Sequence, residues 1–222
     1  MKIYLATGNL NKKREMSELL SEYTVVVPQD EGISFDPEET GTTFFENSMI
    51  KAQALWNIVH CPVIADDSGI CLDALDGAPG VYSSRYAGPD FMKGRPDGKK
   101  IAQEMQNDFL VKQVNERLSA GIDTSPRNGL FPNGPRSLRY VCSMVLFFGP
   151  GRFYSAQETM EGTLVESLSD AAGTGGFGYD PLVFLPQYGK TAAQLTADQK
   201  NSISHRGKAA RAILAALNTF QP

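Results

Sequence analysis

Hydrophobic and polar positions form a series of short apolar runs and helical periodicities along the chain. Residues 2–6 are an apolar run that predicts a buried strand, and residues 11–21 carry apolar side chains at the i, i+3, i+4 and i+7 spacing of a helix. A short β run follows at 24–27, whereas residues 28–43 are rich in Asp, Glu, Pro and Gly and indicate a loop. The stretch "TGNLNK" is therefore predicted to be a strand-to-helix turn.

A second helix is predicted to begin at Thr43, because Thr43 and Glu46 have the spacing of a capping box. Lys51 is expected on the outer face of this helix. The apolar face that we expect consists of Phe45, Met49, Ala52, Trp56 and Val59.

The remainder of the chain continues the alternation of helices and strands. Residues 62–65 predict a short buried strand that ends in "DDSG" at 66–69. The later elements that we expect are a helix over 98–119, an irregular Pro/Gly-rich loop over 121–137, strands within 138–148 and 152–168, a glycine-rich loop over 173–181, and a C-terminal helix that begins near Ser204. Interleaved strands and helices indicate an α/β fold.

Composition excludes some classes of partner. The chain has 222 residues, 41% of them hydrophobic, and a net charge of −4. Such a mildly acidic chain lacks the dense basic face that nucleic-acid backbones require, and no apolar run has transmembrane length. The three cysteines, Cys61, Cys71 and Cys142, form no CxxC pair, so we expect small, buried, reduced thiols in a cytoplasmic protein. From the charge and the short apolar runs, we expect no nucleic-acid or membrane partner.

The turn "TGNLNKKRE" at 7–15 admits two interpretations. A strand-to-helix turn presents backbone N–H groups and the positive end of a helix dipole, so Gly8, Asn9 and Lys12 suit a phosphate. Alternatively, Asn9 or Asn11 only caps the helix and the basic residues at 12–14 face solvent. The stretch by itself leaves both open.

The "ADDSG" stretch at 65–69 places two adjacent carboxylates at a buried strand. Successive strand side chains point in opposite directions, so only one of the pair need face a site. Carboxylates here suit a hard cation such as Mg²⁺, and Glu38 or Glu39 of the acidic loop could supply another oxygen ligand. The alternative is an Asx-type turn with a solvated acidic tip.

Two further stretches point to a nucleotide. In "GGFGYDP" at 175–181, Phe177 or Tyr179 offers a face on which a purine can stack, unless the rings only fill the edge of the core. In "KNSISHRGKA" at 200–209, Lys200, His205 and Arg206 are expected to converge at the start of the last helix. A structural histidine and a surface arginine are the alternatives there.

Six motifs in order resemble the Ham1/ITPase-like family of noncanonical purine nucleoside triphosphate pyrophosphatases. They cover most of residues 1–90 and 138–217 and read "ATGNLNKKRE", "EETG-TTFFENSMIKA", "PVIADDSGI", "LDGAPGVYSSRYAG", "GTGGFGYDPLVFLP" and "KNSISHRGKA". The resemblance implies Mg²⁺-dependent hydrolysis of ITP, dITP and XTP to the nucleoside monophosphate and pyrophosphate, which cleanses the nucleotide pool. It also implies a homodimer and one two-lobed α/β domain over 1–222, with an extended mixed sheet and the active site in the cleft between the lobes.

The resemblance also assigns roles to residues. Asp67 would be the general base and a Mg²⁺ ligand, and Glu39 a further ligand, with Glu38 as the competing choice. The residues that would bind the triphosphate are Thr7, Gly8, Asn9, Lys12, Lys51 and Ser68. The base and sugar loop would be Phe177, Gly178, Tyr179 and Asp180, and the pocket would be completed by Lys200, His205 and Arg206.

Chemistry supports these roles, because magnesium and lysines neutralise phosphate charge while a carboxylate activates water. A donor such as Arg206, or a backbone N–H, would pair with the 6-oxo group of hypoxanthine and reject adenine. Residues 91–137 are longer than in the family, and we expect a surface elaboration without a catalytic role. A nucleotide sensor without activity and a phosphatase that releases orthophosphate are the rival functions.

Overall fold

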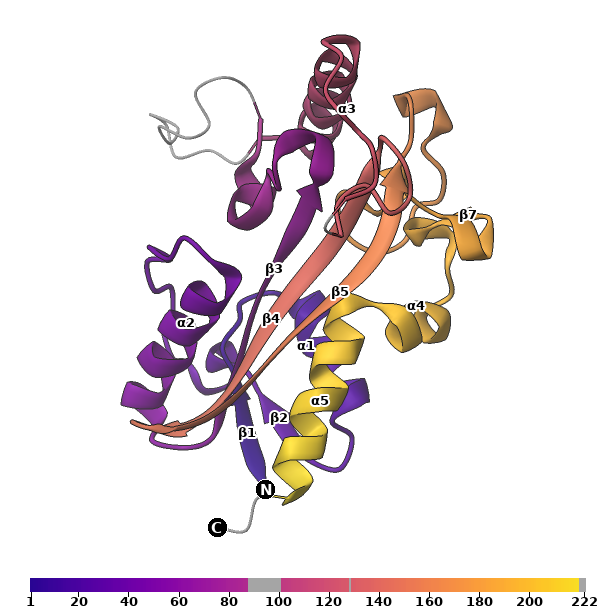
Figure 1. Cartoon of the computed structure of the whole chain (residues 1–222). Coiled ribbons are helices and arrows are strands. Elements are labelled where there is room, and N and C mark those ends of the chain that lie inside the picture. The colour runs from indigo at the N-terminus through magenta and orange to yellow at the C-terminus, as the bar shows by residue number, and fades with distance from the viewer. Residues whose placement is uncertain (88–100, 128, 220–222) are drawn as a thin grey trace. The chain divides into compact units, whose positions relative to one another are not determined.

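The computed structural model describes residues 1–87, 101–127 and 129–219 (Figure 1). The chain comprises two compact units. Unit 1 consists of Met1–Ser68, Val141–Thr159 and Asn201–Pro222, and unit 2 of Gly69–Tyr140 and Met160–Lys200.

The fold is α/β, as the sequence predicted. Its strands are ordered β2-β1-β3-β4-β5-β6-β7, and the sheet is mixed, because β1 is parallel to β2 and β3 whereas β6 is antiparallel to β5 and β7. The strands are β1 (Lys2–Leu5), β2 (Thr24–Val26), β3 (Val63–Leu72), β4 (Ser137–Gly149), β5 (Arg152–Leu164), β6 (Val183–Leu185) and β7 (Lys190–Thr191). The helices are α1 (Leu10–Leu19), α2 (Phe44–Val59), α3 (Gln103–Ser119), α4 (Ala197–Ile203) and α5 (His205–Thr219).

Unit 1 has a layered core with helices on both faces of its strands. On one face, Ile3 of β1 and Ile64 of β3 pack in one cluster with Met16 of α1 and Ile213 of α5. On the other face, the neighbouring positions pack with Leu55 of α2. The alternation of strand side chains therefore sends odd and even positions to different helices.

The same alternation decides where the polar end of β3 points. Ile64 belongs to the cluster of α1 and α5, and Ala65 to the cluster of α2. β3 continues through residues 66–69 to Leu72, so the side-chain alternation also continues. Asp66 therefore follows Ile64 toward α1 and α5, and Asp67 follows Ala65 toward α2.

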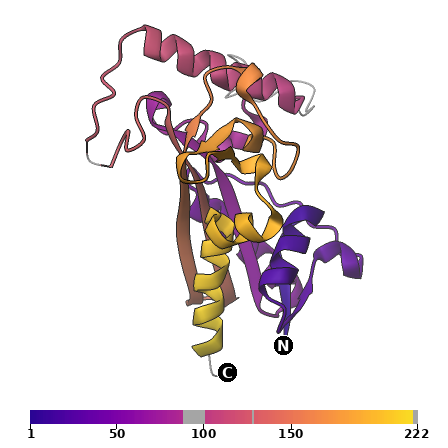
Figure 2. The ribbon, with the colours of Figure 1, turned by 90° about the vertical axis from the view of Figure 1, so that its right-hand side faces the viewer.

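Unit 2 contains β6, β7, α3 and the glycine-rich loop. The inner face of α3 is buried and is formed by Gln106, Leu110, Val111 and Val114. Buried Asp73 accepts a hydrogen bond from the Phe131 backbone N–H at 2.6 Å and pairs with Arg139 at 2.9 Å. Figure 2 shows α3 alongside the segment that leads into β6.

Three expectations from the sequence require correction. The "DDSG" stretch does not end a strand, because β3 runs through it without a turn. Residues Phe44, Asn47, Ser48, Lys51, Ala52 and Leu55 are the buried positions of α2, so the expected apolar face was rotated and Lys51 is not on an outer face. The short helix α4 precedes α5 and was not predicted.

Several other expectations are confirmed. The capping box of Thr43 and Glu46 is present at the start of α2, and residues 173–181 form a loop that passes into a short 3-10 turn. α5 begins at His205, one residue after the expected start. The predicted helix over 98–119 is α3, which begins at Gln103. Residues 91–100 and 128 of the segment 91–137 lie outside the described residues, so the predicted start of the helix at 98 also lies outside them.

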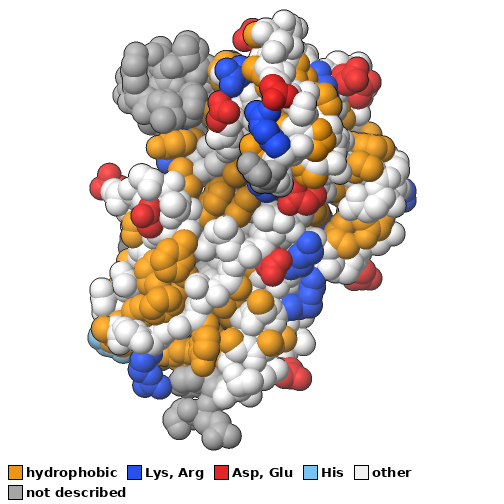
Figure 3. Space-filling view, viewed as in Figure 1, with side chains coloured by type: hydrophobic (Ala, Val, Ile, Leu, Met, Phe, Trp, Pro, Cys, Tyr) orange, Lys and Arg blue, Asp and Glu red, His pale blue; other side chains and the backbone are white. Residues whose placement is uncertain are grey.

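The surface of unit 1 carries exposed aromatic side chains. Phe45, Phe153 and Tyr154 are each about two-fifths exposed, and the rings of Phe45 and Phe153 are 6.4 Å apart. Figure 3 shows hydrophobic side chains on the viewed face.

No helix in the described part of the chain is both long and apolar enough to span a membrane. All three cysteines are free thiols, of which Cys142 is buried while Cys61 and Cys71 are half-buried.

Candidate active site

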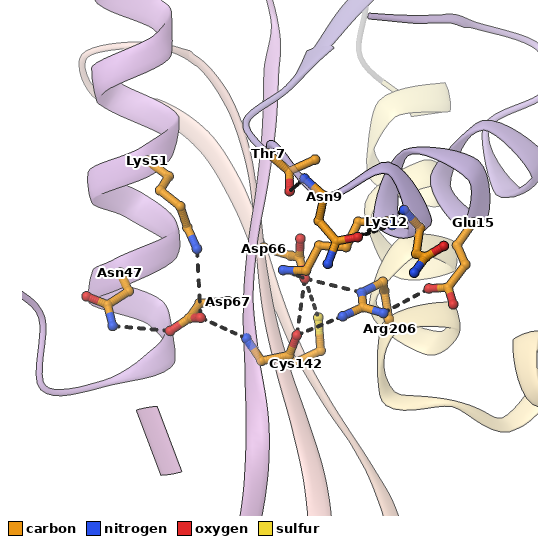
Figure 4. A network of polar contacts seen from close by, with 12 residues as sticks. Thr7, Asn9, Lys12, Glu15, Asn47, Lys51, Asp66, Asp67, Cys142 and Arg206 are labelled. Carbon is orange, nitrogen blue, oxygen red and sulfur yellow. Dashed lines mark hydrogen bonds and ion pairs between the residues drawn. The ribbon is translucent and has the colours of Figure 1, made fainter. Parts of the chain in front are cut away.

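Asp66 and Asp67 occupy consecutive positions on β3 and have different charged partners within one polar network, whose two sides are linked by Ser68 (Figure 4). The side around Asp66 joins α1 and α5, and the side around Asp67 joins α2. Both lie in unit 1. This confirms the expectation that only one of the two carboxylates faces a given site, and it excludes the solvated turn.

Asp66 is a buried carboxylate whose Oδ2 atom is surrounded by donors. It lies 2.9 Å from Lys12 Nζ, 3.2 Å from Arg206 Nε and 3.2 Å from the Ser68 hydroxyl. Burial alone would raise the pKa of Asp66, but the charges of Lys12, Arg206 and Lys51 outweigh it and hold that pKa well below its ordinary value. Asp66 is therefore a permanent anion that fixes two cations.

Arg206 is held by three protein oxygens. Besides Asp66, its Nη1 donates to Glu15 Oε2 at 2.8 Å and its Nη2 donates to Ser68 Oγ at 3.0 Å. Only 6% of Arg206 is exposed, so the surface interpretation of this residue is wrong. These hydrogen bonds engage Nε, Nη1 and Nη2, so each guanidinium nitrogen of Arg206 has a protein partner.

The position of Arg206 depends on a close approach between α4 and α5. A Cβ atom on Gly207 would lie 2.0 Å from the Asn201 carbonyl oxygen, which also accepts a hydrogen bond from Arg211 Nη1 at 2.9 Å. Glycine is therefore required where "SHRGK" enters the last helix. His205, the first residue of α5, is buried.

Asp67 faces the buried side of α2. Its Oδ2 accepts a hydrogen bond from Asn47 Nδ2 at 3.2 Å, its Oδ1 accepts one from the Ser68 backbone N–H at 3.0 Å, and Lys51 Nζ lies 3.7 Å from Oδ1. Burial raises the pKa of Asp67 above its ordinary value, although the charge of Lys51 partly opposes this. Asp67 is thus the carboxylate of the pair that takes up a proton more readily.

Asn47 is oriented toward Asp67 by the loop that precedes α2. Its Oδ1 accepts a hydrogen bond from the Gly41 backbone N–H at 2.8 Å, and a Cβ atom on Gly41 would lie 2.6 Å from that same oxygen. Glycine at position 41 therefore permits the approach that leaves Asn47 Nδ2 free to donate to Asp67. This explains a glycine within the "EETG" stretch.

Glu39 and Asp67 share one lysine. Lys51 Nζ lies 3.2 Å from Glu39 Oε1 and 3.7 Å from Asp67 Oδ1, so a positive charge already sits beside both carboxylates. Glu38 and Glu39 are both exposed, and the contact with Lys51 favours Glu39 of the two candidate ligands. Within the described residues no three His, Cys, Asp or Glu side chains form a ready metal cluster. Any cation here would need ligands from a bound molecule or water in addition to the protein.

The turn between β1 and α1 confirms the helix cap of the second interpretation but not its solvent-facing Lys12. Asn9 is the N-cap of α1, and its Oδ1 accepts from the Asn11 N–H at 2.9 Å, while its own N–H donates to Thr7 Oγ1 at 3.1 Å. Lys12, however, does not face solvent, because its ammonium is paired with Asp66. A Cβ atom on Gly8 would make only an ordinary contact, 3.6 Å from Gln29 Nε2, so the fold itself does not require glycine there.

The glycine-rich loop of unit 2 is organised by Asp180. Its buried carboxylate accepts the Phe177 N–H at 2.5 Å and is paired with Lys200, whose ammonium lies 5.0 Å from the centre of the Phe177 ring. Gly176 has φ +84°, and a Cβ atom there would lie 1.9 Å from Asp180 Oδ2. Asp180 and Lys200 therefore shape the loop that carries Phe177.

Tyr179 differs from the expectation of a free stacking face. It is buried, and its hydroxyl lies 2.9 Å from the Ser83 carbonyl oxygen. Burial raises the pKa of this hydroxyl. Phe177 is less buried than Tyr179, so Phe177 is the better candidate for stacking on a base.

Sequence reasoning missed three residues of the charged network. Asn47 lies one helical turn before Lys51 on α2, and this i, i+4 spacing of two polar residues was the available signal. Asp66 was recognised only as one of two neighbours, without a role of its own. No local pattern singles out Glu15, because its partner Arg206 is remote in the sequence.

The fold and this network define a class of protein. It is an α/β protein whose charged site is built on one strand of a mixed sheet, with lysines suited to an anion and carboxylates suited to a cation. The chain belongs to the Ham1 family, whose model matches residues 3–216.

Relatives in sequence and structure agree with this family. The chain is 52% identical to the dITP/XTP pyrophosphatase of Treponema denticola, across 94% of each chain. It is 38% identical to the dITP/XTP pyrophosphatase of Escherichia coli, across 97% of this chain and 98% of that one. The solved HAM1 protein of Coxiella burnetii matches with a TM-score of 0.77 and 33% identity, across 99% of this chain and 100% of that one.

Proposed function

We propose that the chain hydrolyses noncanonical purine nucleoside triphosphates, namely ITP, dITP and XTP, to the nucleoside monophosphate and pyrophosphate with Mg²⁺. It would thereby cleanse the nucleotide pool of deaminated purines. Family membership and the names of the relatives support the reaction. The single structural observation that supports it is the grouping of Asp67, Glu39 and Lys51, in which a carboxylate proposed to activate water lies beside groups proposed for a cation and a phosphate.

The phosphate chain is proposed to bind at the basic side chains of unit 1. Lys51 and Lys12 supply positive charge, and the turn at Thr7, Gly8 and Asn9 supplies the start of a helix. Lys12 is held in place by Asp66 before any substrate arrives. Charge neutralisation by groups that are already positioned is the main source of catalysis in phosphoryl transfer.

Mg²⁺ fits the donors that Glu39 and Asp67 offer. Both present carboxylate oxygens, the ligands that Mg²⁺ prefers, and both already lie beside the positive charge of Lys51. When bound, Mg²⁺ would neutralise phosphate charge and orient the phosphate for attack. In the part of the chain that the structure describes, no group of three His, Cys, Asp or Glu side chains forms a closed cage, and Mg²⁺ typically keeps waters and binds together with substrate phosphates.

Asp67 is proposed as the general base. A general base works best when its pKa is moved toward the pH of the reaction, and burial moves the pKa of Asp67 in that direction. Asn47 and the Ser68 N–H hold the carboxylate in one orientation. Asp66, by contrast, is too strongly stabilised as an anion to accept a proton.

The base and sugar are proposed to contact Phe177, Gly178, Tyr179 and Asp180, and Lys200, His205 and Arg206 are proposed as further substrate-binding residues. The half-buried ring of Phe177 supports stacking. Backbone N–H groups are the better candidates for recognising the 6-oxo group, because Arg206 is engaged by Asp66, Glu15 and Ser68.

A cytoplasmic homodimer without nucleic-acid or membrane partners completes the proposal. The three free thiols support a reducing compartment. The exposed rings of Phe45, Phe153 and Tyr154 are the kind of surface that contact between two copies would bury. Sedimentation velocity tests the dimer, and a monomer at micromolar concentration would contradict it.

Product analysis tests the proposed function. The purified protein is incubated with Mg²⁺ and, separately, ITP, XTP, GTP or ATP, and the products are separated by ion-exchange chromatography. We expect IMP and XMP together with pyrophosphate, while GTP and ATP survive. Diphosphates with orthophosphate would instead indicate a phosphatase, and binding without turnover would indicate a sensor.

A further inference from the structure

Helix α3 contacts the glycine-rich loop of unit 2 through a chain of side-chain amides. Gln103 Nε2 donates to Asn107 Oδ1 at 3.0 Å, and Asn107 Nδ2 donates to the Gly178 carbonyl oxygen at 3.2 Å. Gln103 and Asn107 are one helical turn apart, so both amides point to the same side of α3. The second of these bonds fixes the peptide plane that follows Gly178.

A larger residue at Gly178 would have to displace the Gln103 side chain or shift the loop. A Cβ atom there would lie 2.1 Å from Gln103 Oε1 and 2.6 Å from Gln103 Nε2, and its three nearest neighbours all belong to the Gln103 side chain. The small size of Gly178 is therefore suited to its contact with Gln103 of α3. Its backbone conformation does not by itself favour glycine, because its φ lies outside the left-handed range. Loop and helix are fitted to each other at this residue.

The next residue of the loop is held by the buried face of the same helix. The Tyr179 hydroxyl lies 3.1 Å from Gln106 Oε1 and 2.9 Å from the Ser83 carbonyl oxygen. Gln106 is fully buried, and its Nε2 donates to the carbonyl oxygens of Ile101 at 3.2 Å and Ser84 at 3.3 Å. A buried amide with all of these partners is rigid, since losing any one would leave a polar group unsatisfied.

We propose that α3 is the positioning element of the nucleoside-binding loop, with Asn107 setting the Gly178 peptide, Gln103 occupying the space beside Gly178, and Gln106 setting Tyr179. This rests on the proposed function, which assigns residues 177–180 to the base and sugar. It gives a role to the described part of residues 91–137, which the sequence suggested to be a surface elaboration. These residues act through the loop and determine affinity for the nucleoside, while the phosphates are bound by residues of unit 1.

Two probes separate the nucleoside from the phosphates. IMP tests the loop, and inorganic tripolyphosphate, which has no base or sugar, tests the phosphate-binding residues. Replacing Asn107 by Ala should raise the dissociation constant for IMP about fivefold to tenfold, the change expected for one lost hydrogen bond, and leave that for tripolyphosphate unchanged. KM for ITP should rise similarly while kcat stays within about twofold, because the interaction binds substrate and transition state equally. Glu116→Ala, at an exposed position of α3, is the matched control.

A pair of substitutions tests the close fit directly. Gly178→Ala alone should weaken IMP binding, because the new methyl group collides with Gln103. Adding Gln103→Ala removes all three nearest contacts and should restore most of the affinity. If these residues only stabilise the fold, the substitutions would lower the melting temperature and the affinities for IMP and tripolyphosphate together. Gln103→Ala would then not restore IMP binding in the Gly178→Ala variant.

The inference is overturned if the unaltered protein hydrolyses ITP but the Asn107→Ala variant binds IMP as tightly as the unaltered protein does. It is also overturned if Gln103→Ala fails to restore IMP binding in the Gly178→Ala variant. Failure of the proposed function looks different, because then the unaltered protein would not hydrolyse ITP at all. That result would remove the basis of this inference as well. Rescue together with selective loss of IMP binding would establish it.

Discussion

Asp66 and Asp67 are neighbours on β3 with opposite electrostatic environments. The charges of Lys12 and Arg206 keep the pKa of Asp66 low despite its burial, whereas burial raises the pKa of Asp67 despite Lys51. Side-chain alternation in a strand is the cause, because it gives adjacent residues different helices as neighbours. One carboxylate is thereby structural, and the other is available for chemistry.

Replacing Asp66 by Asn should strongly destabilise the protein. The substitution leaves Lys12 and Arg206 without their buried counter-ion, and breaking a buried pair typically costs about 3–5 kcal/mol. Urea unfolding at pH 7 measures this. Asp30→Asn, which removes the exposed partner of Lys13, is the control and should change stability little. Equal effects of the two substitutions would contradict the structural role of Asp66.

Replacing Asp67 by Asn should instead stabilise the protein at neutral pH. A carboxyl whose pKa is raised on folding is more easily ionised in the unfolded chain, so its contribution to stability falls as pH rises above its ordinary pKa of 3.8. Asparagine removes this dependence. The gain should therefore grow with pH through the titration of Asp67 and be absent in acid. Melting temperatures of the Asp67→Asn variant and the unaltered protein are compared across pH 3 to 8. A lower stability of the variant at pH 7 would refute the raised pKa of Asp67.

Lys51 should set the acid limb of the pH–rate profile. Its charge lowers the pKa of Asp67, so Lys51→Met should raise that pKa and move the acid limb to higher pH if Asp67 must be ionised to act. Turnover should also fall, because a positive charge near the phosphates is lost. Lys13→Met, at an exposed pair, is the control. An unmoved acid limb in the Lys51 variant would argue for a different general base.

Gly176→Ala should distort the nucleoside loop more than its backbone conformation alone explains. Both Gly176 and Gly189 have positive φ, and an added Cβ costs roughly 1–2 kcal/mol in this region. At Gly176 the Cβ would also lie 1.9 Å from Asp180 Oδ2 and 2.5 Å from Lys200 Nζ, whereas Gly189 has nothing within 4 Å. Gly176→Ala should therefore weaken IMP binding, and Gly189→Ala should only lower stability. Equal IMP affinities would show that the loop tolerates the methyl group.

The sequence predicted the elements of the fold better than the directions of their charged side chains. The α/β class and the capping box at Thr43 followed from local patterns, which depend on neighbouring residues alone. Lys51 was assigned to an outer face because periodicity treats a lysine as solvent-exposed. Its burial against Glu39 and Asp67 depends on residues that are distant along the chain.

Similar limits applied to the candidate site. The resemblance to a family supplied Asp67 and the loop at 177–180, but it could not reveal that Asp66 holds Lys12 and Arg206. That role becomes visible only when β3 is seen to continue past residue 65 and to keep its alternation. The contacts of Gln103 and Asn107 with Gly178 have no local signature either, because they join segments far apart in the sequence.

The most direct test of the account compares turnover and binding in Asp67→Asn. ITP hydrolysis is measured as pyrophosphate release with Mg²⁺, and ITP affinity is measured by calorimetry with Ca²⁺ in its place. We predict that turnover is abolished while nucleotide binding remains measurable, because the general base is lost and the phosphate-binding lysines stay in place. Full activity of this variant would contradict the assignment of Asp67 as the catalytic carboxylate.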